Sequence, residues 1–323
     1  MAASRNRLSP DLPARVGAVL AGRIGERERL GVGLSGGCDS VVLLHVLVSL
    51  GLAGRLTAIH VHHGLSPNAD AWADFCGAYC QRLGIPLLVK RVAVDRKNGL
   101  GIEASARQSR YSAFAECPVD CLLLAQHRGD QAETLLFNLL RGAGVTGAAA
   151  MPVERQHGAQ RVLRPLLEVS RTEIEAYACA NDLQWIEDES NADTVFSRNF
   201  LRHEAMPLLA SRFPGVEAAF AQSAAHFAEA AALLDELAEI DWQAGCDGEA
   251  FQLSRLRVLS LPRVKNLLRH RLRQLGWQVP VASRLEEFSR QLQSAGPDRH
   301  PELILPDGVM RAAKGRLHWL PSR

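Results

Sequence analysis

Short apolar runs alternate with longer segments of helical periodicity through the first half of the chain. The apolar runs predict strands at residues 31–34, 56–61, 87–92, 121–125 and 161–163. The segments of helical periodicity predict helices at residues 11–22, 40–50, 69–83, 103–116 and 129–140. Strands that are apolar throughout and alternate with helices are typical of a parallel sheet covered on both faces. We therefore predict an α/β fold, a doubly wound, Rossmann-like parallel sheet.

The second half of the chain has a different pattern. From about residue 197 it reads as helical, and residues 213–242, rich in alanine, leucine and acids, predict a long connecting helix that breaks at 245–248. Three short helices are expected within 253–294, and short strands within 302–320. The chain has 323 residues, enough for two domains. The expected divisions are a catalytic domain at 1–212, a connecting helix at 213–248 and a smaller, mainly helical domain at 249–323.

The loop after the first strand has the composition of a phosphate-binding loop. Its two glycines let the backbone approach an anion, and the helix that follows directs its positive end at the same place. An aspartate there would repel phosphate unless a cation lay between them, so Asp39 indicates Mg²⁺. No lysine is present, which distinguishes the loop from the GxxxxGK[ST] type; the alternative is a serine–glycine turn without function. The residues expected to bind the nucleotide are Ser35, Gly36, Gly37, Cys38, Asp39 and Ser40.

A second polar group follows the strand at 121–125. His127 lies at the strand end, and Asp130 and Glu133 share one face of the next helix. Acids at a helix start also stabilise the helix dipole, so capping is the competing interpretation. Arg107 lies on the preceding helix, where a surface salt bridge would look the same, but beside the other motifs it becomes a candidate to neutralise phosphate.

Cysteine and histidine patterns could indicate metal sites. Cys76/Cys80 and Cys117/Cys121 are spaced as CxxxC, which is not the spacing of a zinc or redox site, so we interpret them as buried apolar residues. His60 and His62 would share a strand face. No cysteine or carboxylate is arranged with them locally, so a loop near the nucleotide is the preferred interpretation.

Charge is unevenly distributed along the sequence. Residues 249–323 hold 14 Lys and Arg against 6 Asp and Glu, a net +8, whereas residues 1–248 have a net −6. A basic segment beside an acidic body suggests a polyanionic partner; the alternative is a solvated helical surface. The residues expected to meet an RNA backbone are Arg198, Arg202, Arg263, Lys265, Arg269 and Arg273.

Apolar segments of membrane-spanning length are missing from the sequence, as is the apolar core of an export signal. We therefore expect no membrane association and a cytoplasmic location.

The motifs together resemble a known family. The SGGxDS loop is similar to that of the N-type ATP pyrophosphatases, and the order of motifs over residues 30–205 resembles the bacterial tRNA(Ile)-lysidine synthetases. After HHGL the family often has arginine where this chain has Ser66, and many members continue into a further small C-terminal domain that this sequence lacks. The matching segments are SGGCDS, HHGL, EASARQSRY, AQHRGDQAET, LRGAGVTG, RPLLEVSR and DESNADTVFSRNFLR.

The resemblance implies a reaction and a set of partners. ATP would adenylate C2 of the wobble cytidine in the CAU anticodon of tRNA(Ile), and L-lysine would then displace AMP to form lysidine. It implies that Asp39 holds Mg²⁺, that Arg107 and His127 neutralise the α-phosphate, that Asp130 is the base and that Glu133 holds the lysine amine. A homodimer is compatible with it. Alternatives are another ATP-pyrophosphatase tRNA modifier, such as a 2-thiocytidine synthetase, and a nucleotide-binding module without catalysis.

Overall fold

The computed structural model describes residues 11–64, 66–93, 102–187, 197–296 and 299–322. It divides into two compact units, residues 1–228 and 229–323, and the division lies inside the long helix α10, Val216–Gly245. Residues 188–196 of the DESNADTVFSRNFLR motif and residue 65 of the HHGL motif lie outside the described residues. Each unit has its own hydrophobic core.

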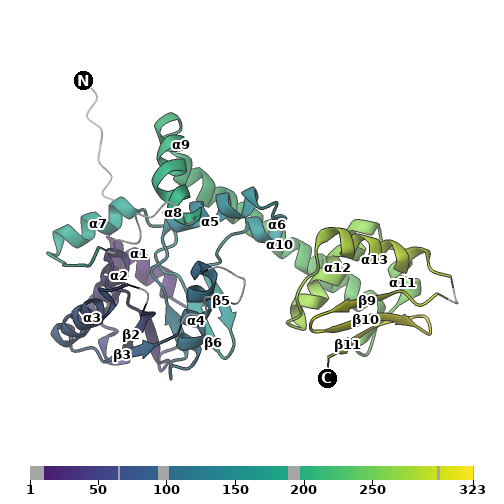
Figure 1. Cartoon of the computed structure of the whole chain (residues 1–323), viewed down its shortest axis with the longest axis horizontal. Coiled ribbons are helices and arrows are strands. Elements are labelled where there is room, and N and C mark those ends of the chain that lie inside the picture. The colour runs from purple at the N-terminus through teal and green to yellow at the C-terminus, as the bar shows by residue number, and fades with distance from the viewer. Residues whose placement is uncertain (1–10, 65, 94–101, 188–196, 297–298, 323) are drawn as a thin grey trace. The chain divides into compact units, whose positions relative to one another are not determined.

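The first unit is built on a six-stranded sheet with the order β3-β2-β1-β4-β6-β5 (Figure 1). Neighbouring strands run parallel except for β5, which pairs antiparallel with β6. The predicted fold class is confirmed, and each of the five predicted strands overlaps an observed one. The strand β5 was not predicted, because it is a short polar edge strand. The strands are β1 Leu30–Gly33, β2 Leu56–His62, β3 Leu87–Arg91, β4 Cys121–Leu123, β5 Glu154–His157 and β6 Gln160–Leu163.

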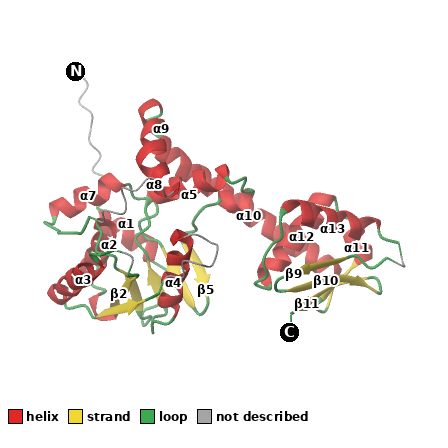
Figure 2. Cartoon of the chain, viewed as in Figure 1, coloured by secondary structure: helices red, strands yellow, loops and turns green. Residues whose placement is uncertain are grey.

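Helices pack against both faces of this sheet (Figure 2). On one face, strand residues such as Val32 and Leu123 pack in a core with α1, α2, α3 and α7; on the other, Leu122 and Val162 pack with Phe114 of α4. Adjacent residues Leu122 and Leu123 are both fully buried, which explains why the strands read as continuous apolar runs. The helices are α1 Leu12–Leu20, α2 Cys38–Ser49, α3 Ala69–Leu83, α4 Ile102–Ala115, α5 Arg128–Leu140, α6 Val145–Ala148, α7 Arg171–Ala180, α8 Ser197–Phe200 and α9 Met206–Arg212. Shorter turns are the 3₁₀ turn Ala53–Arg55 and the π-helical turn η3, Leu201–Ala205.

The second unit places three helices against one face of a five-stranded antiparallel sheet, β7-β8-β11-β10-β9. Residues alternate between buried and exposed along β9 and β10, so only one sheet face enters the core. The long helix ends at Gly245, within the break predicted at 245–248, and residues 246–252 then form the hairpin of β7 and β8, which was not predicted. The elements are β7 Cys246–Asp247, β8 Ala250–Gln252, α11 Leu253–Arg257, α12 Leu261–Gln274, α13 Ala282–Ser294, β9 Glu302–Leu305, β10 Gly308–Ala313 and β11 Arg316–Pro321.

Candidate active site

The glycine loop forms a compact turn between β1 and α2. Its two serines face each other, with 3.1 Å between their hydroxyl oxygens, and the Ser40 hydroxyl donates to the Gly37 carbonyl at 2.9 Å. Gly36 has a φ of +92°, and a Cβ there would lie 2.8 Å from the Ile186 side chain, so glycine is required. The helix begins at Cys38, and its first N–H groups have no intrahelical acceptor. The loop therefore combines free amides, two hydroxyls and a helix N-terminus, the groups that bind phosphate.

Asp39 projects from the first turn of α2 and meets an arginine that the sequence analysis assigned no role. Arg171 Nη1 donates to both carboxylate oxygens of Asp39 at 2.7 Å, and its Nε donates to Glu175. Arg171 is the first residue of α7, where Ser170 and Glu173 form a capping box that fixes the helix start. Burial raises the pKa of Asp39, and nearby cations including Arg171 oppose that shift.

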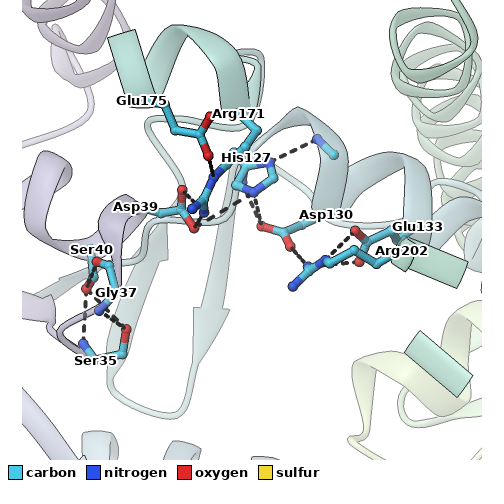
Figure 3. Close-up of polar contacts among 11 residues, drawn as sticks. Ser35, Gly37, Asp39, Ser40, His127, Asp130, Glu133, Arg171, Glu175 and Arg202 are labelled. Carbon is cyan, nitrogen blue, oxygen red and sulfur yellow. Dashed lines mark hydrogen bonds and ion pairs between the residues drawn. The ribbon is translucent and has the colours of Figure 1, made fainter. Parts of the chain in front are cut away.

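His127 lies between two carboxylates (Figure 3). Its Nε2 is 3.9 Å from Asp39 and 3.6 Å from Asp130. The Gly129 amide donates to His127 Nδ1 at 3.0 Å, so Nδ1 is an acceptor and the neutral ring carries its proton on Nε2. That N–H faces the space between the carboxylates. The capping interpretation is also correct, because Asp130 accepts from the His127 amide to complete a capping box for α5.

Asp130 and Glu133 share one arginine. Arg202 donates from Nε and Nη2 to Glu133 at 2.8 and 2.9 Å, and from Nη2 to Asp130 at 2.7 Å. Although burial opposes the charge, these carboxylates raise the pKa of Arg202, and burial raises the pKa of Glu133. Arg202 comes from the π-helical turn η3, and such turns are often found at functional sites. We predicted RNA contact for Arg202; the structure places it within the acid group of the site.

The oxygen donors here suit magnesium. Mg²⁺ in phosphoryl-transfer sites usually takes one or two carboxylates together with substrate phosphates and water. Asp39 and Asp130 lie on either side of His127 and satisfy that requirement. Across the described residues, no three His, Cys, Asp or Glu side chains form a ready-made metal cluster, so any ion would depend on the phosphates for its remaining ligands.

Two other arginines predicted at the site pack on aromatic rings of the first unit. The Arg107 guanidinium carbon lies 5.0 Å from the centre of the Tyr111 ring, and that of Arg198 lies 5.8 Å from the Phe137 ring. Arg107 belongs to α4 and Arg198 to α8. The structure brings together Asp39, His127, Asp130 and Glu133, and no direct contact joins Arg107 to these four in the described hydrogen bonds and ion pairs.

The basic residues predicted in the second unit are mostly paired within it. Arg263 bonds to Asp241, Lys265 to Glu286 at 2.9 Å, and Arg273 to Asp235. Arg269 has no hydrogen bond or ion pair among the described residues.

The division of charge looks different when the chain is divided as it folds. Residues 1–228 hold 23 basic and 23 acidic residues, and residues 229–323 hold 14 and 12. Six acids of residues 229–248, which the sequence analysis counted with the catalytic body, belong to the second unit and largely offset its basic helix. The contrast of +8 against −6 is therefore a property of the chosen boundary, and the folded units carry 0 and +2.

The cysteine interpretation is confirmed and one statement about the histidines is wrong. Cys76, Cys80, Cys117 and Cys121 are free and buried. Cys76 Sγ, however, lies 3.5 Å from the buried His60 Nδ1. The carboxylate of Asp70 also lies 3.2 Å from His62 Nε2, so both a thiol and a carboxylate accompany the histidines. The partners come from α3, which packs on β2.

Comparison with known proteins gives the family. Residues 12–209 match the PP-loop domain family, and residues 251–318 match the TilS substrate binding domain family. The tRNA(Ile)-lysidine synthase of Aromatoleum aromaticum is 48% identical over 309 residues, 94% of this chain and 72% of that protein. The Pseudomonas aeruginosa enzyme of the same name is also 48% identical, over 90% of this chain and 69% of its own length.

Among solved structures, the U34-tRNA thiolase NcsA from Methanococcus maripaludis has a similar fold, with a TM-score of 0.57 and 18% identity over 68% of this chain and 78% of its own. In the described part of the chain, no helix is both long and apolar enough to cross a bilayer. The family matches, the relatives and the arrangement of the PP-loop site agree with one another, and the chain belongs to the tRNA(Ile)-lysidine synthase family.

Proposed function

We propose that this chain uses ATP to join L-lysine to C2 of the wobble cytidine in the CAU anticodon of tRNA(Ile), releasing AMP and pyrophosphate. The observation that carries the proposal is the position of His127 between the Asp39 and Asp130 carboxylates, at the same sheet edge as the SGGCDS loop. Ligands of parallel α/β sheets bind at this carboxyl edge.

In the first step the loop binds the β and γ phosphates through its amides and hydroxyls, and His127 directs its Nε2–H toward the α-phosphate. Preorganised donors of this kind stabilise the charge that develops as pyrophosphate departs. Magnesium, held by Asp39 and Asp130, would neutralise the leaving pyrophosphate. Arg107 is proposed to help neutralise the α-phosphate.

In the second step the lysine amine attacks C2 and AMP leaves. An amine of ordinary pKa is almost wholly protonated near neutral pH, so its proton must be removed as attack proceeds. We assign that proton to Asp130 and the binding of the amine to Glu133. Both carboxylates now pair with Arg202, so the lysine ammonium must share or replace that cation. Because a carboxylate is a weak base, positioning must supply much of the rate.

The test is thin-layer chromatography of [α-³²P]ATP incubated with the protein, tRNA(Ile) transcript and lysine. We expect AMP rather than ADP, and incorporation of radiolabelled lysine into the tRNA. Asp130→Asn should reduce lysine incorporation about 10²-fold or more while ATP binding persists. Normal incorporation by this variant would remove the assigned base. AMP formation without any lysine incorporation would favour another ATP-pyrophosphatase tRNA modification.

Two expectations from the sequence stay predictions: a homodimer, which sedimentation would test, and a cytoplasmic location.

A further inference from the structure

Three arginines surround one tyrosine beside the candidate active site. Arg107 and Arg155 lie with their guanidinium carbons 5.0 and 4.7 Å from the centre of the Tyr111 ring. Arg107 Nη2 reaches the Tyr111 hydroxyl at 3.5 Å, and Arg164 lies close enough to help lower the pKa of this tyrosine. These residues come from α4, β5 and the residue after β6. We call Arg107, Arg155, Arg164 and Tyr111 the arginine cluster.

Arg164 and Tyr111 of the arginine cluster are buried, Arg107 and Arg155 are half-buried, and the described residues supply no counter-charge for them. Arg164 is only 1% exposed, and its Nη1 donates to the Pro152 carbonyl at 2.7 Å. The Nε atoms of Arg155 and Arg164 are buried without a hydrogen-bond partner. No carboxylate among the described residues pairs with Arg107, Arg155 or Arg164. Buried charges are normally paired, so a set of unpaired guanidinium groups indicates that an anion from outside the chain completes it.

The surroundings of Tyr111 show the strength of this positive field. Burial alone would raise the pKa of Tyr111, but Arg107, Arg164 and Arg155 together lower it. Arg110, one position away on α4, adds a further guanidinium whose pKa is lowered by burial and by Arg107. Arg110 also lacks a carboxylate bond in the described set. The field therefore extends beyond the three arginines that touch the ring.

Arg164 of the arginine cluster directly follows β6 and so lies at the carboxyl edge of the sheet, while Tyr111 packs on His157, whose strand partner Gln160 begins β6. The sheet order places β1, which leads to the phosphate loop, beside β4, which leads to His127, and β4 beside β6, which leads to Arg164. Strand spacing of about 4.8 Å separates β1 from β6 by roughly 10 Å. The phosphate loop and Arg164 therefore follow strands that lie on either side of β4, whose end leads to His127.

We propose that Arg155 and Arg164 of the arginine cluster bind a backbone phosphate of the RNA substrate, close to the nucleotide that enters the site, while Arg107 keeps its proposed role at the α-phosphate. The proposal rests on the proposed function, since it requires an RNA substrate. A triphosphate held by the glycine loop has its phosphates on the β1 side, so the anion on the β6 side is assigned to the other substrate. Guanidinium groups suit phosphate because their fork of N–H donors matches its oxygens.

The test compares Arg155→Gln with Arg29→Gln. Arg29 pairs with Asp120 at the opposite edge of the same sheet, so its substitution removes the same charge far from the cluster. Filter binding of a tRNA(Ile) transcript is measured across a salt series, and ATP binding is measured separately by equilibrium dialysis. For Arg155→Gln we expect tRNA affinity to fall about tenfold. The slope of log affinity against log salt should decrease by about 0.7–0.9, with ATP affinity unchanged. Arg29→Gln should change neither.

Arg155→Lys separates charge from packing. It should retain the salt slope and recover part of the affinity, because lysine keeps the charge but loses the fork geometry. Thermal melting shows whether each variant is folded. A loss of ATP affinity with unchanged tRNA slope would assign the cluster to the nucleotide, and no change in either would make it a structural stack; both results overturn the proposal. Binding of tRNA is measured without turnover. A protein that bound tRNA but formed no lysidine would therefore contradict the proposed function and leave the test of the arginine cluster unaffected.

Discussion

Arginine–carboxylate pairs occur in both units, but their surroundings differ. In the first unit, Arg171 and Arg202 neutralise carboxylates that border His127 at the ligand-binding edge of a parallel sheet. In the second unit, Arg263 and Arg273 join α12 to acids of α10 within one compact body. At the sheet edge, the His127 Nε2–H and the neighbouring carboxylate oxygens face a common space where a ligand can bind. The pairs of α12, in contrast, hold two helices together.

This difference shows why basic residues should be classified by what faces them rather than by their number. The basic helix α12 was predicted from the sequence to bind RNA. Its charges are, however, largely neutralised by ion pairs with acids of α10. The arginine cluster of the first unit lies in a stretch without any charge excess, yet its guanidinium groups have no carboxylate partner in the described chain. We therefore expect substitutions of these residues in the first unit to change activity, and those of the paired residues Arg263 and Arg273 in α12 to change stability.

The largest expected effect is that of Asp39→Asn. The variant removes the charge that faces Arg171 and the proposed metal while keeping the side-chain shape, so AMP formation should fall at least about 10²-fold. Asp235→Asn is the matched control, because Asp235 also pairs with an arginine, Arg273, but in the second unit. AMP formation is measured by thin-layer chromatography. Similar losses in both variants would contradict the distinction between the two units.

Local sequence was sufficient to predict most of the fold. Apolar runs located every parallel strand of the first sheet, most clearly β1 and β4, which are buried on both faces. The candidate residues at the start of α5 were found for a different reason: His127, its N-cap, lies within seven positions of Asp130 and Glu133. Features that depend on neighbouring residues or on a regular period could therefore be predicted from the sequence.

Contacts between distant segments could not be predicted in this way. Arg171 and Asp39 are 132 positions apart, and they meet because α7 packs on α2. The capping box at Ser170 and Glu173 was a usable signal for the start of α7, but nothing local indicates where its first side chain points. The same limit explains why the contrast in net charge was misjudged. The acids of α10 pair with the bases of α12 only when the two helices pack together.

The next effect concerns stability of the second unit. Arg263→Gln leaves Asp241, which is 3% exposed, without its cation. An unpaired buried carboxylate is strongly destabilising, so we expect the melting temperature of this unit to fall by at least about 5 °C. Differential scanning calorimetry measures it, with Arg290→Gln as the control because Arg290 pairs with Glu286 on the exposed surface of α13. An unchanged melting temperature for Arg263→Gln would show that the pair does not fasten the helices.

A smaller effect should appear in the pH dependence of stability. Burial raises the pKa of Asp39 in the folded state, so the folded protein binds the proton more tightly than the unfolded chain does. The stability contributed by this proton is present below the unfolded pKa and is lost as pH rises through the folded pKa. The Asp39→Asn variant has no such proton to lose. The melting temperature of the variant minus that of the wild type should therefore increase from pH 4 to pH 7. A difference that stays constant or reverses over that range would contradict the raised pKa.

The smallest expected effect concerns the one residue of the predicted basic set for which the described chain shows no hydrogen bond or ion pair, Arg269. If the second unit contacts RNA through α12, this guanidinium is the one available without breaking an internal pair. Arg269→Gln should therefore leave the melting temperature unchanged and weaken tRNA binding a few-fold. The salt slope should decrease by less than about 0.9, the value for one full phosphate contact. Filter binding across a salt series measures it, with Arg155→Gln as the comparison in the first unit. A larger change for Arg269→Gln than for Arg155→Gln would place the main phosphate contacts in the second unit and reverse the contrast between the two regions.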